Sequence, residues 1–462
     1  MRKLFLLFIV FAVLVLGIIS FYNAMTTFSK QMNIKALSLS KINDTLAYNR
    51  LSSAIRIPIV NNPIDSIFIA AEQKFPEFLR EAFPNFHNDP SVSIMGFGSN
   101  SLLYRWKGRD NRMKPILLLA ETDVKDPDLS KLPQWTYNPF LGKISGGYIW
   151  GAGVMDGKAA AIAMLEALEA SVNEDKIPQR TLYLALINNK DKNKSHQILA
   201  DLLQNEGLAF EFVLNSESFL NEGICLGLKR PIAALSTSEK QAISLKMKGY
   251  SPEQLKKKLE NLTLKKRAVP TRGKIAANLL STLTPELFFT DRLLFCNPYL
   301  FGPLINSRLK SDPLLSEMFD IDMEISKMQG IGTEINWLLP PDTDIKSFKE
   351  MIKEEFKDID LVWEEPKEKR KSSPSAGFAY EAMQTSIRQA LGDVIVIPAI
   401  KTEPGKTVYY SRLSSALLDF RPWTFDQAEI ERLNSGVDQR LQLKQYLRGV
   451  DFYRILFKNT LF

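Results

Sequence analysis

Three apolar runs separated by helical patterns constrain the fold of this 462-residue chain more than any other feature. Residues 115–124 form a short apolar run that ends in acidic side chains, and 180–187 and 211–217 are similar runs. Between them, residues 158–173 and 196–204 show the apolar spacing of helices. Strand–helix–strand repetition of this kind is typical of a parallel sheet covered by helices. We therefore predict an α/β fold with a parallel-rich sheet flanked by helices.

A different pattern occupies residues 236–372. It contains an amphipathic strand at 240–249, then a basic helix, and then a strand, a Pro-Pro turn and a helix within 331–355. A charged run with Pro and Ser at 364–374 indicates a loop or boundary. This part is therefore predicted to be a smaller α+β unit inserted into the sheet domain.

The α/β pattern returns after this unit, with a helix at 376–391, a strand at 394–400 and a final helix that ends near Asn459. The length also favours two domains over one. We predict the following organisation: a transmembrane anchor or signal at 1–24, a polar spacer at 25–46, a discontinuous first domain at 47–235 and 373–462, and an inserted domain at 236–372.

The N-terminus places the protein at a membrane. Residues 4–22 contain no charged side chain and are close to the ~20 residues that span a bilayer as a helix. Arg2 and Lys3 precede them, and the next basic residue is Lys30. The positive-inside rule then puts the N-terminus in the cytoplasm and the remainder outside, in the periplasm or the extracellular space.

A cleaved signal peptide is the alternative, and its removal would release a secreted protein. Signal peptides have an apolar core of about 7–15 residues followed by small residues at the cleavage site. Here the core is longer, and the flank around Phe21 and Tyr22 is bulky. We therefore favour a single uncleaved transmembrane helix.

Cysteine and histidine are both scarce. The two cysteines, Cys225 and Cys296, allow at most one disulfide, and their spacing matches no metal or redox motif. We expect them to be small buried residues. The chain also has only two histidines, His87 and His196, although zinc enzymes usually use imidazole ligands.

The net charge of +7 is mild for this length. Much of the excess lies in 256–274, where basic residues alternate with leucines. This pattern predicts a solvated helix face with an apolar underside. A patch for anionic lipid or nucleic acid is the alternative, but no nucleic-acid motif or interleaved aromatic residue accompanies the cluster, so we expect no nucleic-acid partner.

Polar side chains follow the predicted strands. Ligands of open α/β sheets bind at the carboxyl ends of the strands. The side chains expected there are Glu121, Asp123, Asp156, Asn188 to Asp191, Asn215 and Glu217. An acid-rich cleft of this composition has the chemistry of a metal site.

Two strings in this region carry a resemblance. They are PILLLAETDV (115–124) and NPFLGKISGGYIWGAGVMDGKAA (138–160). They resemble the core of the carboxypeptidase S- and aminoacylase-like di-zinc metallopeptidases, with the family's Pro-Phe-x-Gly and Gly-x-x-Trp-Gly-x-Gly-x-x-Asp-x-Lys segments. The similarity runs from about residue 47 to the C-terminus. It implies a zinc-exopeptidase-like fold in which the inserted domain acts as a lid and forms a homodimer.

In that family two zinc ions share a bridging Asp, each ion takes one His and one further carboxylate, and a Glu acts as the general base. Two cations lower the pKa of the bridging water and polarise the amide carbonyl. The resemblance places the bridging Asp at Asp156 and the orienting Asp at Asp123. It places the general base at Lys190 and the other ligands at Glu121, Asp191, Glu217 and Tyr409, with Ser216 as an alternative register for Glu217.

Three of these positions carry side chains unsuited to the family's chemistry. The two His ligands are replaced by Glu121 and Tyr409, and Lys190 is a cation where a base must accept a proton. We expect Lys190 to pair with Asp156, Asp191 or Glu217 and to supply the charge of the missing metal. This predicts an inactive or strongly altered family member without a cofactor, whose cleft binds a small peptide or an N-acyl amino acid.

An active hydrolase is the alternative. Glu121, Asp156, Asp191 and Glu217 would then hold two zinc ions or a harder ion such as Mg²⁺, Mn²⁺ or Ca²⁺ in an oxygen-rich site. Glu121 or Tyr409 would assist proton transfer. A scaffolding role at the membrane surface also fits. Trp337 stands where the family has an Arg that can hold a substrate carboxylate, which indicates a changed ligand.

Overall fold

The computed structural model describes residues 2–462 apart from ten short segments: 61–65, 125–128, 190–193, 218–219, 222–224, 249, 266–272, 328–331, 357–360 and 367–368. Lys190 and Asp191 therefore lie outside the described residues, and their predicted roles stay predictions.

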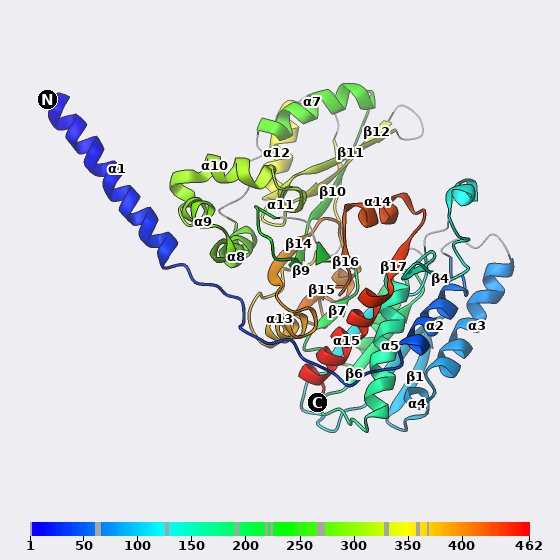
Figure 1. Cartoon of the computed structure of the whole chain (residues 1–462). Coiled ribbons are helices and arrows are strands. Elements are labelled where there is room, and N and C mark those ends of the chain that lie inside the picture. Colours follow the sequence, from blue (N-terminus) through cyan, green and yellow to red (C-terminus); the bar gives the residue numbers. More distant parts are fainter. Residues whose placement is uncertain are drawn as a thin grey trace.

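A ten-stranded mixed sheet forms the centre of the protein (Figure 1). Its order is β1-β2-β6-β3-β7-β15-β9-β8-β16, and β14 also pairs with β9. The strands are β1 (Val92–Phe97), β2 (Ser101–Trp106), β3 (Ile116–Glu121), β6 (Leu182–Ile187), β7 (Val213–Asn215), β8 (Leu220–Asn221), β9 (Ile232–Glu239), β14 (Ile395–Lys401), β15 (Leu417–Asp419) and β16 (Thr424–Phe425).

The three apolar runs of the sequence become β3, β6 and β7 at the middle of this sheet. β3 pairs in parallel with both of the others, as predicted. Leu118 faces one core, whereas Leu117 and Leu119 face the other, so both sides of the strand are buried. This explains why the run is continuously apolar instead of alternating. The sheet as a whole is mixed, because β2 pairs antiparallel with β1 and β6, and β9 with β8 and β15.

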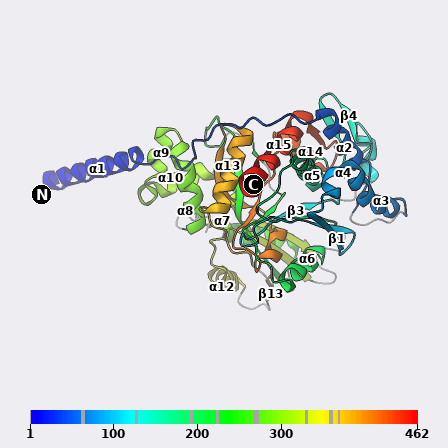
Figure 2. The same cartoon turned by 90° about the horizontal axis from the view of Figure 1, so that it is seen from below.

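Helices cover both faces (Figure 2). On one face, α2, α5, α13 and α15 share a core with the sheet, and on the other face α6, α8 and α11 do so. The helices beside this sheet are α2 (Asp44–Ile55), α3 (Ser66–Ala82), α4 (Pro84–Asn88), α5 (Gly157–Asn173), α6 (Lys194–Asn205), α8 (Lys274–Leu283), α9 (Phe289–Phe295), α10 (Pro298–Lys310), α11 (Pro313–Phe319), α13 (Phe378–Leu391), α14 (Gln427–Ser435) and α15 (Leu443–Thr460).

A second sheet has its own core. Its four strands lie in the order β11 (Asp322–Lys327), β12 (Gly332–Leu339), β10 (Gln241–Lys248) and β13 (Val362–Glu364). Helices α7 (Pro252–Lys265) and α12 (Ile345–Glu355) cover it around the buried Trp337. The predicted strand, Pro-Pro turn and helix are confirmed by β12 and α12. The predicted domain bounds, and a dimer through this region, stay predictions.

The structure also tests the sequence predictions for the basic helix and the two cysteines. Leu255 and Leu259 are buried on the underside of α7, as the basic helix pattern predicted. Both cysteines are free thiols; Cys225 is buried and Cys296 is partly exposed.

A third sheet consists of β17 (Arg440–Gln442), β5 (Tyr148–Trp150) and β4 (Lys143–Ser145). The described part of the chain also contains three short 3-10 helices: η1 (Leu129–Gln134), η2 (Thr284–Glu286) and η3 (Lys406–Tyr410).

The N-terminal helix α1 (Arg2–Met25) projects away from the body (Figure 1). Its segment Phe5–Met25 is long and apolar enough to cross a membrane, and only 6% of its most apolar window is buried. Residues 26–43, which we call the strap, contain neither helix nor strand. The sequence described them as a spacer, but the strap lies on the body: the Leu37 amide donates to the Gln389 carbonyl at 2.9 Å.

Candidate functional site

A cavity of about 650 Å³ lies beside the ends of β3 and β7, the start of α5 and the loop that follows β14. Four residues that the sequence assigned to the site line it together: Glu121, Asp123, Asp156 and Glu217. Tyr409 is not among the described residues that line it. Lys401, Lys406 and Arg421 also line it, although the sequence analysis did not single them out.

A glycine sets the distance between two walls of the cavity. A Cβ on Gly157, the first residue of α5, would lie 2.3 Å from the carbonyl oxygen of Glu121 at the end of β3. Only glycine allows this approach of helix and strand. Asp156 is the N-cap residue of α5, yet its side chain does not cap the helix and keeps 42% of its surface exposed. Its carboxylate therefore remains accessible from the cavity.

Two lysines pair with two carboxylates of the cavity, those of Glu121 and Glu217. The Lys406 ammonium lies 2.9 Å from Oε1 of Glu121 and 2.9 Å from Oε1 of Glu217. Lys401 pairs with the other carboxylate oxygen of Glu217. We call Lys401 and Lys406 the lysine clamp. Lys401 ends β14, and Lys406 opens η3.

The clamp determines the charge states of its partners. Burial opposes the ionisation of Glu217, but Lys401 and Lys406 hold the pKa of its carboxyl well below its usual range. Burial likewise opposes the charged form of Lys406, but Glu217 and Glu121 raise its pKa. The hydrogen bond from His196 and the charge of Lys406 outweigh burial and lower the pKa of Glu121. Both carboxylates are therefore ionised, and both are compensated by the protein itself.

Further charged side chains contact Lys401 or pair with its neighbours. The Lys401 ammonium lies 3.8 Å from Asp419, and the Arg370 guanidinium pairs with Asp419 at 2.6 Å and with Glu239 at 3.5 Å. The side chains of Arg370 and Asp419 are fully buried. Arg370 belongs to the charged run that the sequence identified as a loop or boundary, so its burial was not expected.

His196 contacts the site from behind. It is fully buried on α6, and its Nε2 lies 3.1 Å from Oε1 of Glu121, while its Nδ1 lies 3.1 Å from the Tyr410 hydroxyl. Burial raises the pKa of Tyr410 well above its usual value, so this hydroxyl stays protonated and can donate. The resemblance assigned neither histidine to a ligand position. His196 nevertheless contacts Glu121, which occupies one of those positions, whereas His87 bonds to Phe83 and Tyr104 elsewhere.

Tyr409, which the resemblance placed at a His ligand position, belongs to an apolar layer. Its ring stacks on His196 with a centroid distance of 6.3 Å and an interplanar angle of 19°. It packs against the core that includes Leu199 and Leu413. A Tyr at this position therefore serves packing, and no side chain of η3 other than Lys406 is among the described residues lining the cavity.

Two buried titratable groups, Asp123 and Lys158, lie close to one another at the site. Burial and the charge of Glu121 raise the pKa of Asp123 to about 6, although the Asn189 amide donates to it at 2.9 Å. Burial lowers the pKa of Lys158 to about 7, and its ammonium donates to the Ile57 carbonyl at 2.9 Å. Asp123, predicted to orient a His ligand, thus receives a backbone amide instead.

Arg421 joins two loops of the cavity wall. Its guanidinium donates to the carbonyls of Met155 and Glu217 and lies 3.5 Å from Asp156. It therefore adds a third cation to the carboxylate cluster. Of the other polar residues expected in the cleft, Asn215 is buried and donates to Asp419 at 3.1 Å, and Asn188 donates to Glu72.

The described residues do not fit a pair of zinc ions. The carboxylate oxygens of Glu121 and Glu217 point at ammonium groups, and a metal ion there would meet the charge of Lys406. No imidazole lines the cavity among the described residues. Over the same part of the chain, no three His, Cys, Asp or Glu side chains are grouped as a metal ion requires.

Comparison with known proteins identifies relatives of this site and fold. Residues 117–459 match the sequence profile of Peptidase family M20/M25/M40. The chain is 30% identical to Probable carboxypeptidase S-like 2 of Dictyostelium discoideum, over 84% of this chain and 79% of that protein. It is 24% identical to the N-fatty-acyl-amino acid synthase/hydrolase PM20D1 of Mus musculus, over 89% of this chain and 87% of that protein.

Solved structures share the fold at lower identity. An M20 family metallo-carboxypeptidase from Sulfolobus solfataricus has a TM-score of 0.57 and 12% identity, with 89% of this chain and 98% of that chain covered. Human carnosine dipeptidase 1 has a TM-score of 0.56 and 11% identity, with 90% and 97% covered. The resemblance seen in the strand and loop motifs is thereby confirmed, and the chain belongs to the M20/M25/M40 peptidase family.

Proposed function

We propose that this protein is a non-hydrolytic, membrane-anchored member of the family whose cleft binds a small peptide or an N-acyl amino acid. The observation that carries the proposal is the Lys406 ammonium, 2.9 Å from both Glu121 and Glu217. A fixed cation between these carboxylates supplies the positive charge that a metal ion would supply. It offers neither a bound water of lowered pKa nor an open coordination position, which metal-assisted hydrolysis requires.

The names of the relatives support the ligand class. One is called carboxypeptidase S-like and another N-fatty-acyl-amino acid synthase/hydrolase, and both names refer to amino acids in amide linkage. A volume of about 650 Å³ falls in the range of small-molecule sites. Lys131 and Arg421 offer cations for a ligand carboxylate, and Trp135 offers an apolar surface.

Two observations support the anchor. The apolar part of α1 is almost entirely exposed, so it has no place in the protein core. Arg2 and Lys3 precede it, and the positive-inside rule then directs the body out of the cytoplasm.

Metal content and turnover test the hydrolytic half of the proposal. The full chain, purified in detergent, is analysed for metals and assayed on dipeptides and N-acyl amino acids with added Zn²⁺, Mn²⁺ or Co²⁺. We expect no tightly held metal and no hydrolysis. Two equivalents of zinc, or turnover that Asp156→Ala abolishes, would show an active hydrolase with a non-standard oxygen-rich site and would overturn the proposal.

Thermal unfolding tests the ligand half independently. A ligand of the native state raises the melting temperature with its concentration. We expect a member of an N-acyl amino acid and dipeptide panel to do so, and Arg421→Met to weaken that response. A panel with no effect on the full chain would rule out this ligand class.

A further inference from the structure

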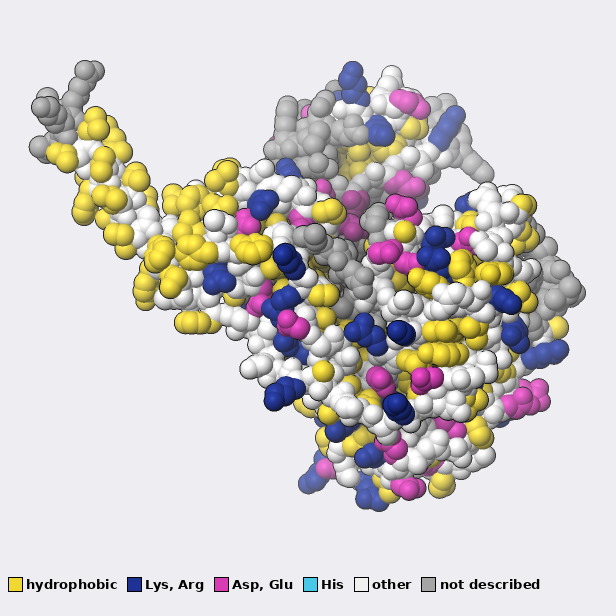
Figure 3. Space-filling view, viewed as in Figure 1, with side chains coloured by type: hydrophobic (Ala, Val, Ile, Leu, Met, Phe, Trp, Pro, Cys, Tyr) yellow, Lys and Arg dark blue, Asp and Glu magenta, His cyan; other side chains and the backbone are white. Residues whose placement is uncertain are grey.

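Five large apolar side chains are exposed together at the base of α1. Phe288 and Phe289 lie at the start of α9, and Tyr299, Leu300 and Leu304 lie on α10. Tyr299 is 92% exposed and Leu304 is 56% exposed. Figure 3 shows the apolar surface of α9 and α10 running on into that of α1. We call these five residues the α9–α10 patch. A cluster of this kind on a folded protein marks an interaction surface.

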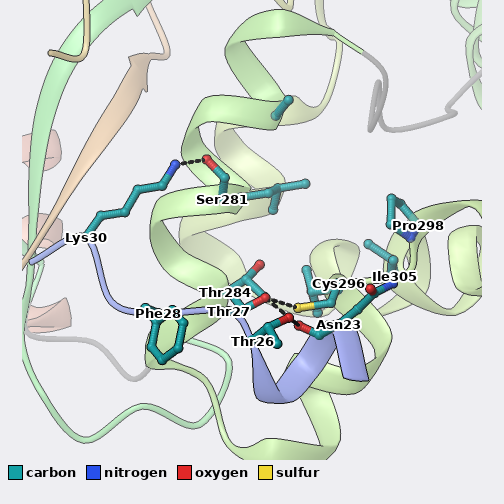
Figure 4. Close-up of a pocket in the computed structure, with 13 residues that line it drawn as sticks. Asn23, Thr26, Thr27, Phe28, Lys30, Ser281, Thr284, Cys296, Pro298 and Ile305 are labelled. Atoms are coloured by element: carbon teal, nitrogen blue, oxygen red, sulfur yellow. Dashed lines mark hydrogen bonds between the residues drawn. The ribbon is translucent and has the colours of Figure 1, made fainter. Parts of the chain in front are cut away.

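The base of α1 is fastened to the same helices by polar contacts (Figure 4). The Asn23 amide donates to the Asn297 side chain at 2.8 Å, and Thr27 lies 3.1 Å from the Cys296 sulfur. The Lys30 ammonium donates to Ser281 of α8 at 2.7 Å. These bonds surround a cavity of about 600 Å³ between the strap and α8–α10. The patch therefore keeps a constant position relative to α1.

The contacts also give the depth of the patch. The ring of Phe21 packs on Phe289 with a centroid distance of 5.5 Å, and Asn297 donates to the Ser20 carbonyl at 3.3 Å. Both α1 residues lie inside the apolar segment Phe5–Met25. Phe21 precedes Met25 by four residues, which is ~6 Å along a helix. A side chain that contacts Phe21 therefore lies alongside the apolar segment, short of its C-terminal end at Met25.

From this continuity we propose that the α9–α10 patch enters the lipid bilayer beside α1. The inference rests on the proposed anchor, because the bilayer is the one that α1 would span. Helices that lie in a membrane interface bury their apolar face about 5–10 Å into the boundary between headgroups and acyl chains, which is comparable to the depth given by Phe21. Aromatic side chains such as Tyr299 are enriched at that level. A lipid occupant follows because the apolar surface of the patch continues onto the apolar surface of α1 (Figure 3).

Fluorescence quenching in vesicles tests the insertion. Single cysteines are placed at Tyr299 and Leu304 of the full chain in a Cys296→Ser background, since Cys225 is buried. Each is labelled with an environment-sensitive fluorophore and reconstituted into phosphatidylcholine vesicles with or without nitroxide-bearing lipid. The controls are Ile177, in the loop after α5, and Val362 of β13, which at 49% and 50% are about as exposed as Leu304. A cysteine at Val13 reports on α1 itself.

We expect quenching of about twofold or more at 299 and 304, and little at the two controls. Quenching at 13 without quenching at 299 and 304 would overturn the insertion and leave the anchor standing. Quenching at 299 and 304 without quenching at 13 would support the patch and contradict the anchor. If a second copy of the chain covers the patch, the labels at 299 and 304 would be buried in detergent as well as in vesicles, and nitroxide-bearing lipid would not quench them. This outcome would also overturn the proposal.

Discussion

At the scale of single residues, the charge of Lys406 has the largest predicted effect. Lys406→Met leaves Glu121 and Glu217 ionised without their shared cation. Removing one partner of a largely buried ion pair costs about 3 kcal/mol or more, so we expect a loss of that order in the unfolding free energy. Because the vacated position is bordered by two carboxylates, millimolar Zn²⁺ should recover part of the loss. Chemical denaturation with and without Zn²⁺ measures both effects.

Lys131→Met is the matched control, because Lys131 lines the same cavity and donates to the Ser435 carbonyl at 3.3 Å. We expect a change within about 0.5 kcal/mol and no response to Zn²⁺. Equal effects of the two substitutions would show that Lys406 does not compensate the carboxylates.

A second prediction at this scale concerns His87 and pH. Burial lowers the pKa of His87, whose Nδ1 lies 2.7 Å from the Phe83 carbonyl and whose Nε2 lies 3.2 Å from the Tyr104 hydroxyl. A lowered folded pKa contributes stability above the unfolded value of 6.5, and this contribution is lost as pH falls through the folded pKa. Wild type should therefore lose unfolding free energy below about pH 6.5 more steeply than His87→Gln. Urea denaturation across that range gives the comparison, and parallel curves would refute it.

Sequence alone located the acidic half of the site but not its cations. Glu121, Asp123 and Asp156 follow recognisable motifs, so their meeting in one cavity was predictable. Lys406 is three residues from the position assigned to a His ligand, and nothing in its local pattern shows that its long side chain reaches Glu217. Lys190, at which a compensating cation was predicted, lies outside the described residues, so that prediction stays open. Arg370 lies in a charged run, and such runs are usually solvated, so its burial could only be seen in the fold.

At the scale of elements, the contact of α15 with Trp423 provides a packing test. A Cβ on Gly449 of α15 would lie 2.1 Å from a ring carbon of the fully buried Trp423. Gly→Ala in a helix normally stabilises by up to ~1 kcal/mol, but overpacking a rigid core costs about 1–3 kcal/mol. We expect Gly449→Ala to lower the unfolding free energy by about 2 kcal/mol.

Gly302 in α10 is the control, since a Cβ there would meet nothing within 4 Å. Gly302→Ala should be neutral or slightly stabilising. Thermal or chemical unfolding of the two variants separates helix propensity from packing. If Gly449→Ala is as stable as wild type, α15 can shift away from Trp423.

Most elements were predictable because their periodicity is local. The strands at 115–124 and 394–400 and the helices at 158–173 and 376–391 appear as β3, β14, α5 and α13. The antiparallel edges of the sheet were not predicted, because local periodicity identifies a strand without identifying its partner. Local periodicity also does not show which sheet a helix packs on. Helices α8 and α11 lie within the predicted insert, yet they share a core with β14 of the central sheet.

At the scale of the whole molecule, the strap connects α1 to the body over residues 26–43. The Gln31 amide donates to the Val396 carbonyl at 2.9 Å, and the Val396 amide donates to the Gln31 side chain at 2.8 Å. Arg454 donates to the Ser40 carbonyl at 2.8 Å near the other end. The strap falls within the predicted polar spacer, because bonds to distant residues leave no trace in a local sequence pattern.

The two hydrogen bonds between Gln31 and Val396 predict that Gln31→Ala loosens the strap without unfolding the protein. Loss of two hydrogen bonds should free the strap locally, while β14 keeps its pairing with β9 and its place in the core. We expect trypsin to cleave after Lys30 or Lys35 several-fold faster, with a change in global unfolding free energy below about 1 kcal/mol. Limited proteolysis followed by mass spectrometry measures the rate. An unchanged cleavage rate would show that other contacts hold the strap.

The strap also determines how the protein meets other molecules. A flexible linker of the same length would let the body wander roughly 20–25 Å from its anchor and turn freely. With α1 spanning the bilayer as proposed, a strap bonded along its course would give the body one height and one tilt over the membrane. Encounters with other components of that membrane would then be confined to a plane and to a narrow range of approach angles. The proposed ligand would reach the cavity from one direction.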